Sequence, residues 1–134
     1  MGIRKRNKAN ILKDKKRKLA IAKLRNCPIS PRKMRSVADL LRGKEVGKAL
    51  NILKFNPRHA SKFLEKLLLS AISNWQSKNE DQSIESTKII VNEIKVDGGR
   101  ILKRLRPAPQ GRAHRIRKRS NHVTVVLESN NEIK

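Results

Sequence analysis

The chain has 134 residues, a length that predicts one domain rather than two. Its net charge of +23, from 34 Lys and Arg against 11 Asp and Glu, calls for a polyanionic partner: nucleic acid first, an anionic membrane surface second. No apolar run approaches the ~20 residues of a membrane span, and no apolar stretch follows the basic start as in a secretory signal. A single cysteine excludes an internal disulfide and a multi-cysteine zinc site.

Residues 1–18 form a basic tail. They carry nine basic residues and one acid, Asp14, and their apolar residues show no helical spacing. Because such a segment has little to bury, we predict that it is disordered without RNA and folds on RNA. A helix packed antiparallel against a partner is the less favoured alternative.

The body begins with a weak strand pattern in LAIAKLRN, residues 19–26. Ser30-Pro31 then marks a helix start, with the serine as N-cap and the proline at the first helical position. Asn56-Pro57 repeats this arrangement and predicts a second such start.

Three helices are predicted between residues 30 and 76. The first ends at Gly43, which is a suitable C-cap, and the second runs from about Glu45 to Lys54. Apolar residues recur at helical spacing along all three and form the predicted core: Met34, Val37, Ala38, Leu41, Val46, Ala49, Leu50, Leu53, Ala60, Phe63, Leu64, Leu67, Leu68, Ala71, Ile72 and Trp75.

Two clearer strands follow a polar loop at residues 77–86. They are TKIIVNEIKV, residues 87–96, and HVTVVLE, residues 122–128, both rich in β-branched residues. The predicted fold class is therefore α+β, with three helices packed on a small antiparallel three-stranded sheet. A long hairpin and the basic N-terminal tail extend from it.

The connection between these two strands has two possible turns. Asp97-Gly98 is a strong signal for a tight hairpin turn. Alternatively the turn is PAPQG, residues 107–111, and both strands continue outward as a long arm. We prefer the second interpretation, with Asp97-Gly98-Gly99 as a bulge or bend where the arm leaves the body.

The preferred turn predicts a register in which paired residue numbers sum to about 218. Ile94 then faces Thr124, and Val91 faces Leu127. The apolar halves of both strands meet inside the body and the basic halves meet outside it. An isolated ribbon of this kind is marginal in water and repels itself, so we expect its partner to order it.

The predicted arm has cations on both faces and no acid between residues 100 and 120. A partner that surrounds the arm would use both faces, whereas a flat duplex would use one. Only Phe55, Phe63 and Trp75 are aromatic, which disfavours binders that stack bases on aromatic platforms. We therefore expect contacts to phosphate backbones and folded RNA shapes.

No catalytic motif is present: the chain lacks a phosphate-binding G-x-x-x-x-G-K-[ST] loop, H-E-x-x-H and G-x-S-x-G. His59, His114 and His122 are far apart in sequence and predict no metal site, and Cys27 is assigned to packing. We expect no enzyme and no cofactor. The rival functions are a free-standing nucleic-acid compactor or RNA chaperone and a membrane-active cationic domain, which the balanced middle of the chain disfavours.

The stretch GRAHRIRKRSNHVTVV strongly resembles the C-terminal signature of the L-twenty-two family of large-subunit ribosomal proteins. SPRKMRSVADLLRGKEVGKALNIL resembles the first two helices of that family, and residues 60–75 resemble its long third helix. The resemblance covers residues 20–128. It divides the chain into a basic extension (1–18), a family-like domain (19–128) with an extended hairpin at about 97–121, and a C-terminal tail (129–134).

The resemblance implies a cytoplasmic protein of the large ribosomal subunit that binds and organises ribosomal RNA during assembly. Its hairpin would line the nascent-peptide exit tunnel beside another ribosomal protein, L-four, with the nascent peptide passing by. Neither a membrane nor a second copy of the chain is expected as a partner. Many bacterial members carry Arg-Ala in the tip where this chain has Ala108-Pro109, so no basic contact is expected there, and the proline stiffens the turn.

Two sets of residues are assigned to these roles. The tip expected to face the tunnel comprises Arg106, Pro107, Ala108, Pro109, Gln110 and Gly111. The residues expected to contact RNA lie in the tail, around the first helix and along the arm: Arg4, Lys5, Arg6, Lys15, Lys16, Arg17, Lys18, Arg25, Arg32, Lys33, Arg35, Arg100, Lys103, Arg104, Arg106, Arg112, His114, Arg115, Arg117, Lys118 and Arg119.

Overall fold

The computed structural model describes residues 2–79 and 87–129. Most of the predicted loop at 77–86 and nearly all of the predicted C-terminal tail lie outside these ranges. The elements in chain order are α1 (Ile3–Lys18), β1 (Ala20–Cys27), α2 (Pro31–Ala38), α3 (Val46–Phe55), α4 (His59–Gln76), β2 (Ile89–Pro107) and β3 (Ala113–Ser129).

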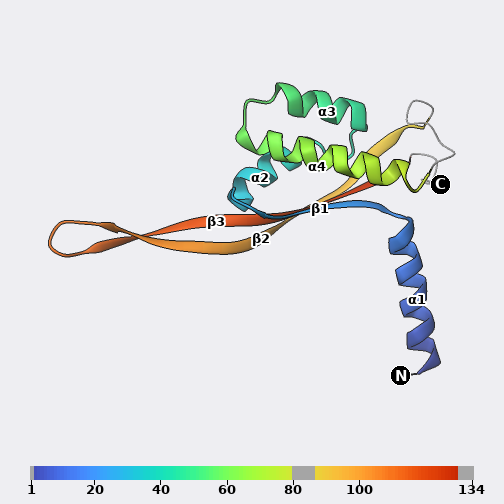
Figure 1. Cartoon of the computed structure of the whole chain (residues 1–134), viewed down its shortest axis with the longest axis horizontal. Coiled ribbons are helices and arrows are strands. Elements are labelled where there is room, and N and C mark those ends of the chain that lie inside the picture. Colours follow the sequence, from blue (N-terminus) through green and yellow to red (C-terminus); the bar gives the residue numbers. More distant parts are fainter. Residues whose placement is uncertain (1, 80–86, 130–134) are drawn as a thin grey trace.

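The three strands form one antiparallel sheet in the order β1-β3-β2. Helices α2, α3 and α4 cover one face of its body, while the far halves of β2 and β3 project as a two-stranded arm (Figure 1). The predicted α+β class is confirmed, and the weak strand pattern at residues 19–26 forms β1, directly before α2.

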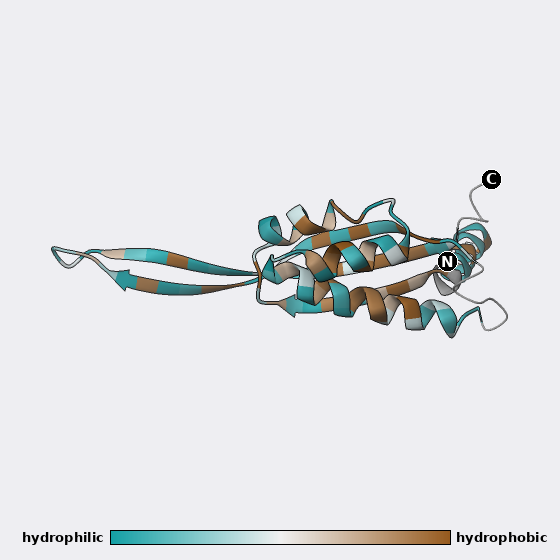
Figure 2. Cartoon of the chain, turned by 90° about the horizontal axis from the view of Figure 1, so that it is seen from above, coloured by the Kyte–Doolittle hydropathy of each residue, from teal (hydrophilic) through white to brown (hydrophobic). Residues whose placement is uncertain are grey.

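The core lies between α4, the smaller helices and the inner face of the sheet. Leu64 and Leu68 on α4 are 1% exposed, and Val91, Val123 and Leu127 from the sheet are equally well buried. Figure 2 shows apolar residues concentrated in this body and mostly hydrophilic residues along the arm. Hydrophobic burial therefore stabilises the body and contributes little along the arm.

The helix starts follow two different local rules. Ser30 caps α2 as predicted: its Oγ accepts a hydrogen bond from the backbone N of Lys33 at 3.4 Å, and proline follows it. The prediction for α4 was wrong, because Asn56 Oδ1 accepts instead from the backbone N of Arg58 at 3.1 Å and the helix begins only at His59. An asparagine side chain that bonds two residues ahead makes a turn rather than a cap.

The hairpin turn lies at the predicted PAPQG segment. Val91 pairs with Leu127 as expected, but Ile94 pairs with Val125 and not with Thr124. A register shift between Val91 and Glu93 adds one residue to β2, and this bulge explains the correction. A second shift between Gly98 and Ile101 lies where the arm leaves the body, next to the predicted Asp97-Gly98-Gly99 bend.

Gly99 sits in this second bulge against the partner strand. A Cβ added there would lie 2.6 Å from Ser120 Oγ and 3.2 Å from the Ser120 carbonyl carbon, whereas one added at Gly98 would have no neighbour within 4 Å. Ser120 Oγ in turn donates to the backbone oxygen of Arg100 at 2.6 Å. The root of the arm therefore requires glycine at only one of its two glycine positions.

We expect Gly99→Ala to lower the free energy of unfolding by about 1 to 3 kcal/mol, because the added methyl displaces Ser120 from Arg100. Gly98→Ala is the matched control and should change it by less than about 0.5 kcal/mol. Urea unfolding measures the difference, and amide hydrogen exchange locates it at the bulge. Equal effects of the two substitutions would show that the close approach at Gly99 is not maintained in solution.

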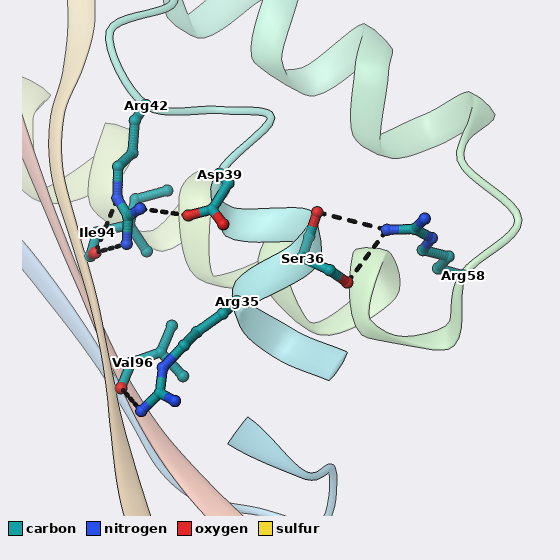
Figure 3. Close-up of polar contacts among 7 residues, drawn as sticks. All are labelled: Arg35, Ser36, Asp39, Arg42, Arg58, Ile94 and Val96. Atoms are coloured by element: carbon teal, nitrogen blue, oxygen red, sulfur yellow. Dashed lines mark hydrogen bonds and ion pairs between the residues drawn. The ribbon is translucent and has the colours of Figure 1, made fainter. Parts of the chain in front are cut away.

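Two arginines donate hydrogen bonds to backbone oxygens along the free edge of β2 in the body. Arg35 Nη2 donates to the backbone oxygen of Val96 at 3.0 Å, and Arg42 donates to that of Ile94 through Nη2 at 2.9 Å and Nε at 3.3 Å (Figure 3). Arg42 Nη1 also binds Asp39. These contacts fix α2 to the strand that becomes the arm, and they blunt an edge that would otherwise be open to strand pairing.

The N-terminal segment is helical in the structure, whereas its apolar residues lack helical spacing and it was predicted to fold only on RNA. Helix α1 runs from Ile3 to Lys18, and its described side chains through Lys15 are exposed. Lys, Arg, Ala and Leu are good helix formers even where no apolar stripe exists, which explains the difference. Helix α1 projects from the sheet on the side opposite to α2–α4 (Figure 1). Whether it is disordered without RNA stays a prediction.

Candidate nucleic-acid interface

The register of β2 and β3 assigns each arm residue to a face of the ribbon. Directly paired residues lie on one face and neighbours along a strand alternate between faces. The pairs Lys103–Arg117 and Leu105–Arg115 therefore share a face with the pair Ile101–Arg119. The opposite face carries the pairs Leu102–Lys118, Arg104–Ile116 and Arg106–His114.

Both faces of the arm are thus basic, as the sequence predicted. One face presents Lys103, Arg115, Arg117 and Arg119, and the other presents Arg104, Arg106, His114 and Lys118. All eight side chains are exposed. Among the described residues, Arg104 donates through Nη1 to the neighbouring Lys103 backbone oxygen, at 2.9 Å, and keeps its other donors for a partner.

The arm has no carboxylate of its own to neutralise these cations. Ion pairs join Lys48 to Glu45 and Lys95 to Glu93, but they belong to the body. Since like charges on one ribbon repel each other, an external polyanion lowers the free energy of the extended arm. The arrangement is typical of a surface that binds phosphates.

The tip is a tight loop with two residues in the left-handed region. Gln110 has φ 62° and Gly111 has φ 70°. The backbone N of Ala108 donates to the Arg112 oxygen at 2.9 Å and closes the loop. Two prolines restrict the backbone here, so the tip keeps one shape while most of its side chains stay exposed.

Three aliphatic side chains on the arm are solvent-exposed, and none of them was assigned a role from the sequence. Leu102, Leu105 and Ile116 are 45%, 69% and 39% exposed. The sequence did carry a signal for them. Large apolar residues alternate with cations there, in a segment too thin to form a core. Such side chains can contact sugars and base faces while the cations bind phosphates.

The predicted basic residues of the body are placed differently. Arg25 and Arg32 are exposed on β1 and on the first turn of α2, while Arg35 is partly engaged with the sheet edge. On α1, Arg4, Lys5, Arg6 and Lys15 are exposed; the side chains of Lys16, Arg17 and Lys18 lie outside the described part. Helix α1 extends from the end of the sheet that lies far from the arm (Figure 1).

Lys33 is the predicted body residue that the fold brings to the arm. It lines a cleft of about 680 Å³ together with Arg117, Lys118 and Arg119. Arg58 and His59 also line this cleft. Neither residue was predicted to contact RNA, although a basic start to a helix without acids in its first turn was a usable signal.

The profile of one protein family, Ribosomal protein L22p/L17e, matches residues 22–128, from within β1 almost to the end of β3. The chain belongs to this family. It is 66% identical over 131 residues to the large ribosomal subunit protein uL22 of Christiangramia forsetii, covering 98% of this chain and 97% of that protein. The uL22 protein of Flavobacterium johnsoniae is 64% identical over 127 residues, covering 95% and 93%.

A third relative, uL22 of Porphyromonas gingivalis, is 55% identical over 131 residues, covering 98% of this chain and 97% of that protein. The predicted resemblance to the L-twenty-two family is therefore confirmed. The profile begins after α1, whereas alignments that cover 98% of this chain include most of that helix. The alignments with these uL22 relatives therefore extend over the N-terminal segment, which the family profile does not cover.

His59, His122 and Cys27 make contacts within the body of this L22p/L17e family member. His122 Nδ1 accepts from the Asn26 backbone N at 3.0 Å, and His59 meets the Phe63 ring edge-on at 5.2 Å. Burial raises the pKa of the Cys27 thiol. Within residues 2–79 and 87–129, no cluster of His, Cys, Asp and Glu could hold a metal ion, and no helix is long and apolar enough to cross a membrane.

Proposed function

We propose that this chain organises large-subunit ribosomal RNA during assembly and that its β2–β3 arm lines the nascent-peptide exit tunnel. As a member of a ribosomal protein family with large-subunit relatives, it is a structural constituent of the large ribosomal subunit and not an enzyme. The observation that carries the proposal is the arm, whose two faces are both basic, exposed and free of carboxylates.

The distribution of charge favours an enclosing partner. A duplex lying against one face would leave the cations of the other face in solvent, where they add self-repulsion and no binding. Folded ribosomal RNA can surround a narrow ribbon and place phosphates on both faces. Helix α1, with nine basic residues in the first 18, supplies a further RNA contact on the other side of the sheet.

The length of the arm suits the tunnel. From Arg100 to Pro107, eight residues of β2 at ~3.3 Å each place the tip roughly 25 Å beyond the body. In this proposal the body docks on RNA near the tunnel exit, and the tip reaches inward beside L-four to a narrow point that the nascent peptide passes.

Deleting Pro107–Gln110 tests the tunnel role directly. The deletion removes the tip and leaves the basic stems, so subunits should assemble while the constriction becomes wider or reshaped. We expect altered nascent-chain pausing and altered macrolide binding in ribosomes that carry the deletion. A control chain with the same four positions replaced by Gly and Ser separates loss of length from loss of the stiff tip.

Normal pausing and drug binding in fully assembled subunits would exclude the tunnel role of the tip and leave the RNA-binding role intact. Failure to assemble would instead show that the tip is needed for docking.

A further inference from the structure

A cleft lies where the arm leaves the body, and three elements line it. Helix α2 and the residues just before it form one wall, the start of α4 forms the second, and β3 at the root of the arm forms the third. Its volume of about 680 Å³ is within the usual range for sites that bind a small ligand or a nucleotide. The cleft thus joins the rigid body to the projecting arm.

The walls of this root cleft are strongly basic. Lys33 and Arg58 come from the body, Arg117, Lys118 and Arg119 come from the arm, and no Asp or Glu lines the space. The buried side chains of Ile29 and Ala60 form its apolar part. Cations held on opposite sides of a space without carboxylates create a site for an anion.

Arg58 is held in place by α2. Its Nη1 donates to Ser36 Oγ at 3.1 Å and to the Ser36 backbone oxygen at 3.4 Å (Figure 3). Among the described residues, Nε and Nη2 of Arg58 make no hydrogen bond, so the planar guanidinium keeps donors for a phosphate. Helix α4 has no side-chain cap and no acid in its first turn, which adds positive potential at the same place.

The root of the arm needs an added contact that connects it to the body. The bulge between Gly98 and Ile101 interrupts the ladder of β2 and β3 at this point, and an exposed two-stranded ribbon is marginal without support. On one face of the ribbon, Arg117 and Arg119 lie two residues apart and border the cleft opposite the body cations. An anion that binds both sides would connect arm to body.

We infer that the root cleft binds the phosphodiester backbone of a single RNA strand and that this strand sets the direction of the arm. The inference rests on the proposed function, which supplies ribosomal RNA as the partner. The volume of the cleft matches that of a small-ligand site, which is enough for a short segment of one strand. A phosphate that binds both Arg58 and either Arg117 or Arg119 holds the root of the arm in one orientation relative to the body.

A double-mutant cycle with a transcript of large-subunit ribosomal RNA tests the bridge. The body variant is Lys33→Gln with Arg58→Gln, and the arm variant is Arg117→Gln with Arg119→Gln. Each should lower the slope of log affinity against log salt by about 1 to 2. If one strand contacts both sides, the combined variant should lose clearly less affinity than the product of the two separate losses.

The matched control is Lys62→Gln with Lys66→Gln, which removes the same charge from exposed positions of α4 outside the cleft. Lys33→Gln alone guards against a folding effect of losing the Arg58–Ser36 contact. A body variant that binds like the control, or losses that multiply in the combined variant, would overturn the inference.

The direction of the arm relative to the body can be measured independently of affinity. Spin labels on Asn51→Cys and Gln110→Cys report the distance from α3 to the tip, and the buried Cys27 is protected from labelling. We expect added transcript to narrow the distance distribution in the parent and the control, while the body variant stays broad. If the distance distribution also narrows in the body variant, the inference about the root cleft is wrong and the proposed function stands. If the parent does not bind the transcript, the proposed function itself is wrong.

Discussion

Replacing Arg115, Arg117 and Arg119 together by alanine should weaken binding to a large-subunit ribosomal RNA transcript by about a hundredfold at about 0.1 M salt. Each phosphate contact to a single strand contributes roughly 0.7 to the slope of log affinity against log salt, so three contribute roughly 2. The slope should fall by the same amount. Titrations of the transcript at several salt concentrations measure both quantities.

The opposite face of the ribbon provides the matched control. Arg104, Arg106 and Lys118 are also three exposed cations, and the register places them together on that face. RNA that encloses the arm should make the two triple variants lose affinity about equally. A partner on one side would leave one triple variant like the parent, and unchanged slopes in both would show that the arm is not the electrostatic contact.

Patterns that operate within one element were predictable from sequence. The apolar spacing identified α4, and residues such as Leu64 and Leu68 are fully buried, because a helix turns a spacing of three and four residues into one face. Ser30-Pro31 identified the start of α2 for a similarly local reason. The PAPQG turn was predictable because the apolar and basic halves of both strands match only around it.

Features that depend on the neighbouring strand were less predictable. The extra residue in β2 between Val91 and Glu93 shifts the partner of Ile94, and no residue there marks a bulge. Asn121 is another case: it is fully buried, and its Nδ2 donates to the Ile29 backbone oxygen at 2.7 Å. Such contacts join residues 92 positions apart, and local patterns carry no information about them.

The same distinction applies to the interface. The arm cations lie in one stretch without acids, residues 100–120, so the sequence alone was enough to group them. The root cleft instead combines Lys33, Arg58 and Arg119 from three segments, and only the packing of α2 and α4 on the sheet brings them together. Charge runs thus show which segments carry the cations, while the fold determines which cations from different segments line the same cleft.

Leu67→Ala should lower the free energy of unfolding of the isolated protein by about 2 to 5 kcal/mol. Leu67 lies on α4, is 6% exposed and belongs to the core between the helices and the sheet. Truncation to alanine therefore leaves a cavity and removes buried apolar surface. A loss of this size is a large fraction of the stability of a small domain. Urea unfolding followed by circular dichroism measures it.

Leu69→Ala on the same helix is the matched control. The substitution is chemically identical, but Leu69 is 49% exposed and leaves no closed cavity, so the expected loss is below about 1 kcal/mol. Similar losses in the two variants would mean that the buried face of α4 is assigned wrongly. The measurement needs protein free of RNA, because a ligand that binds only the folded state stabilises it by mass action and would mask the cavity. If the body holds the root of the arm as proposed, added ribosomal RNA transcript should recover part of the stability lost in Leu67→Ala.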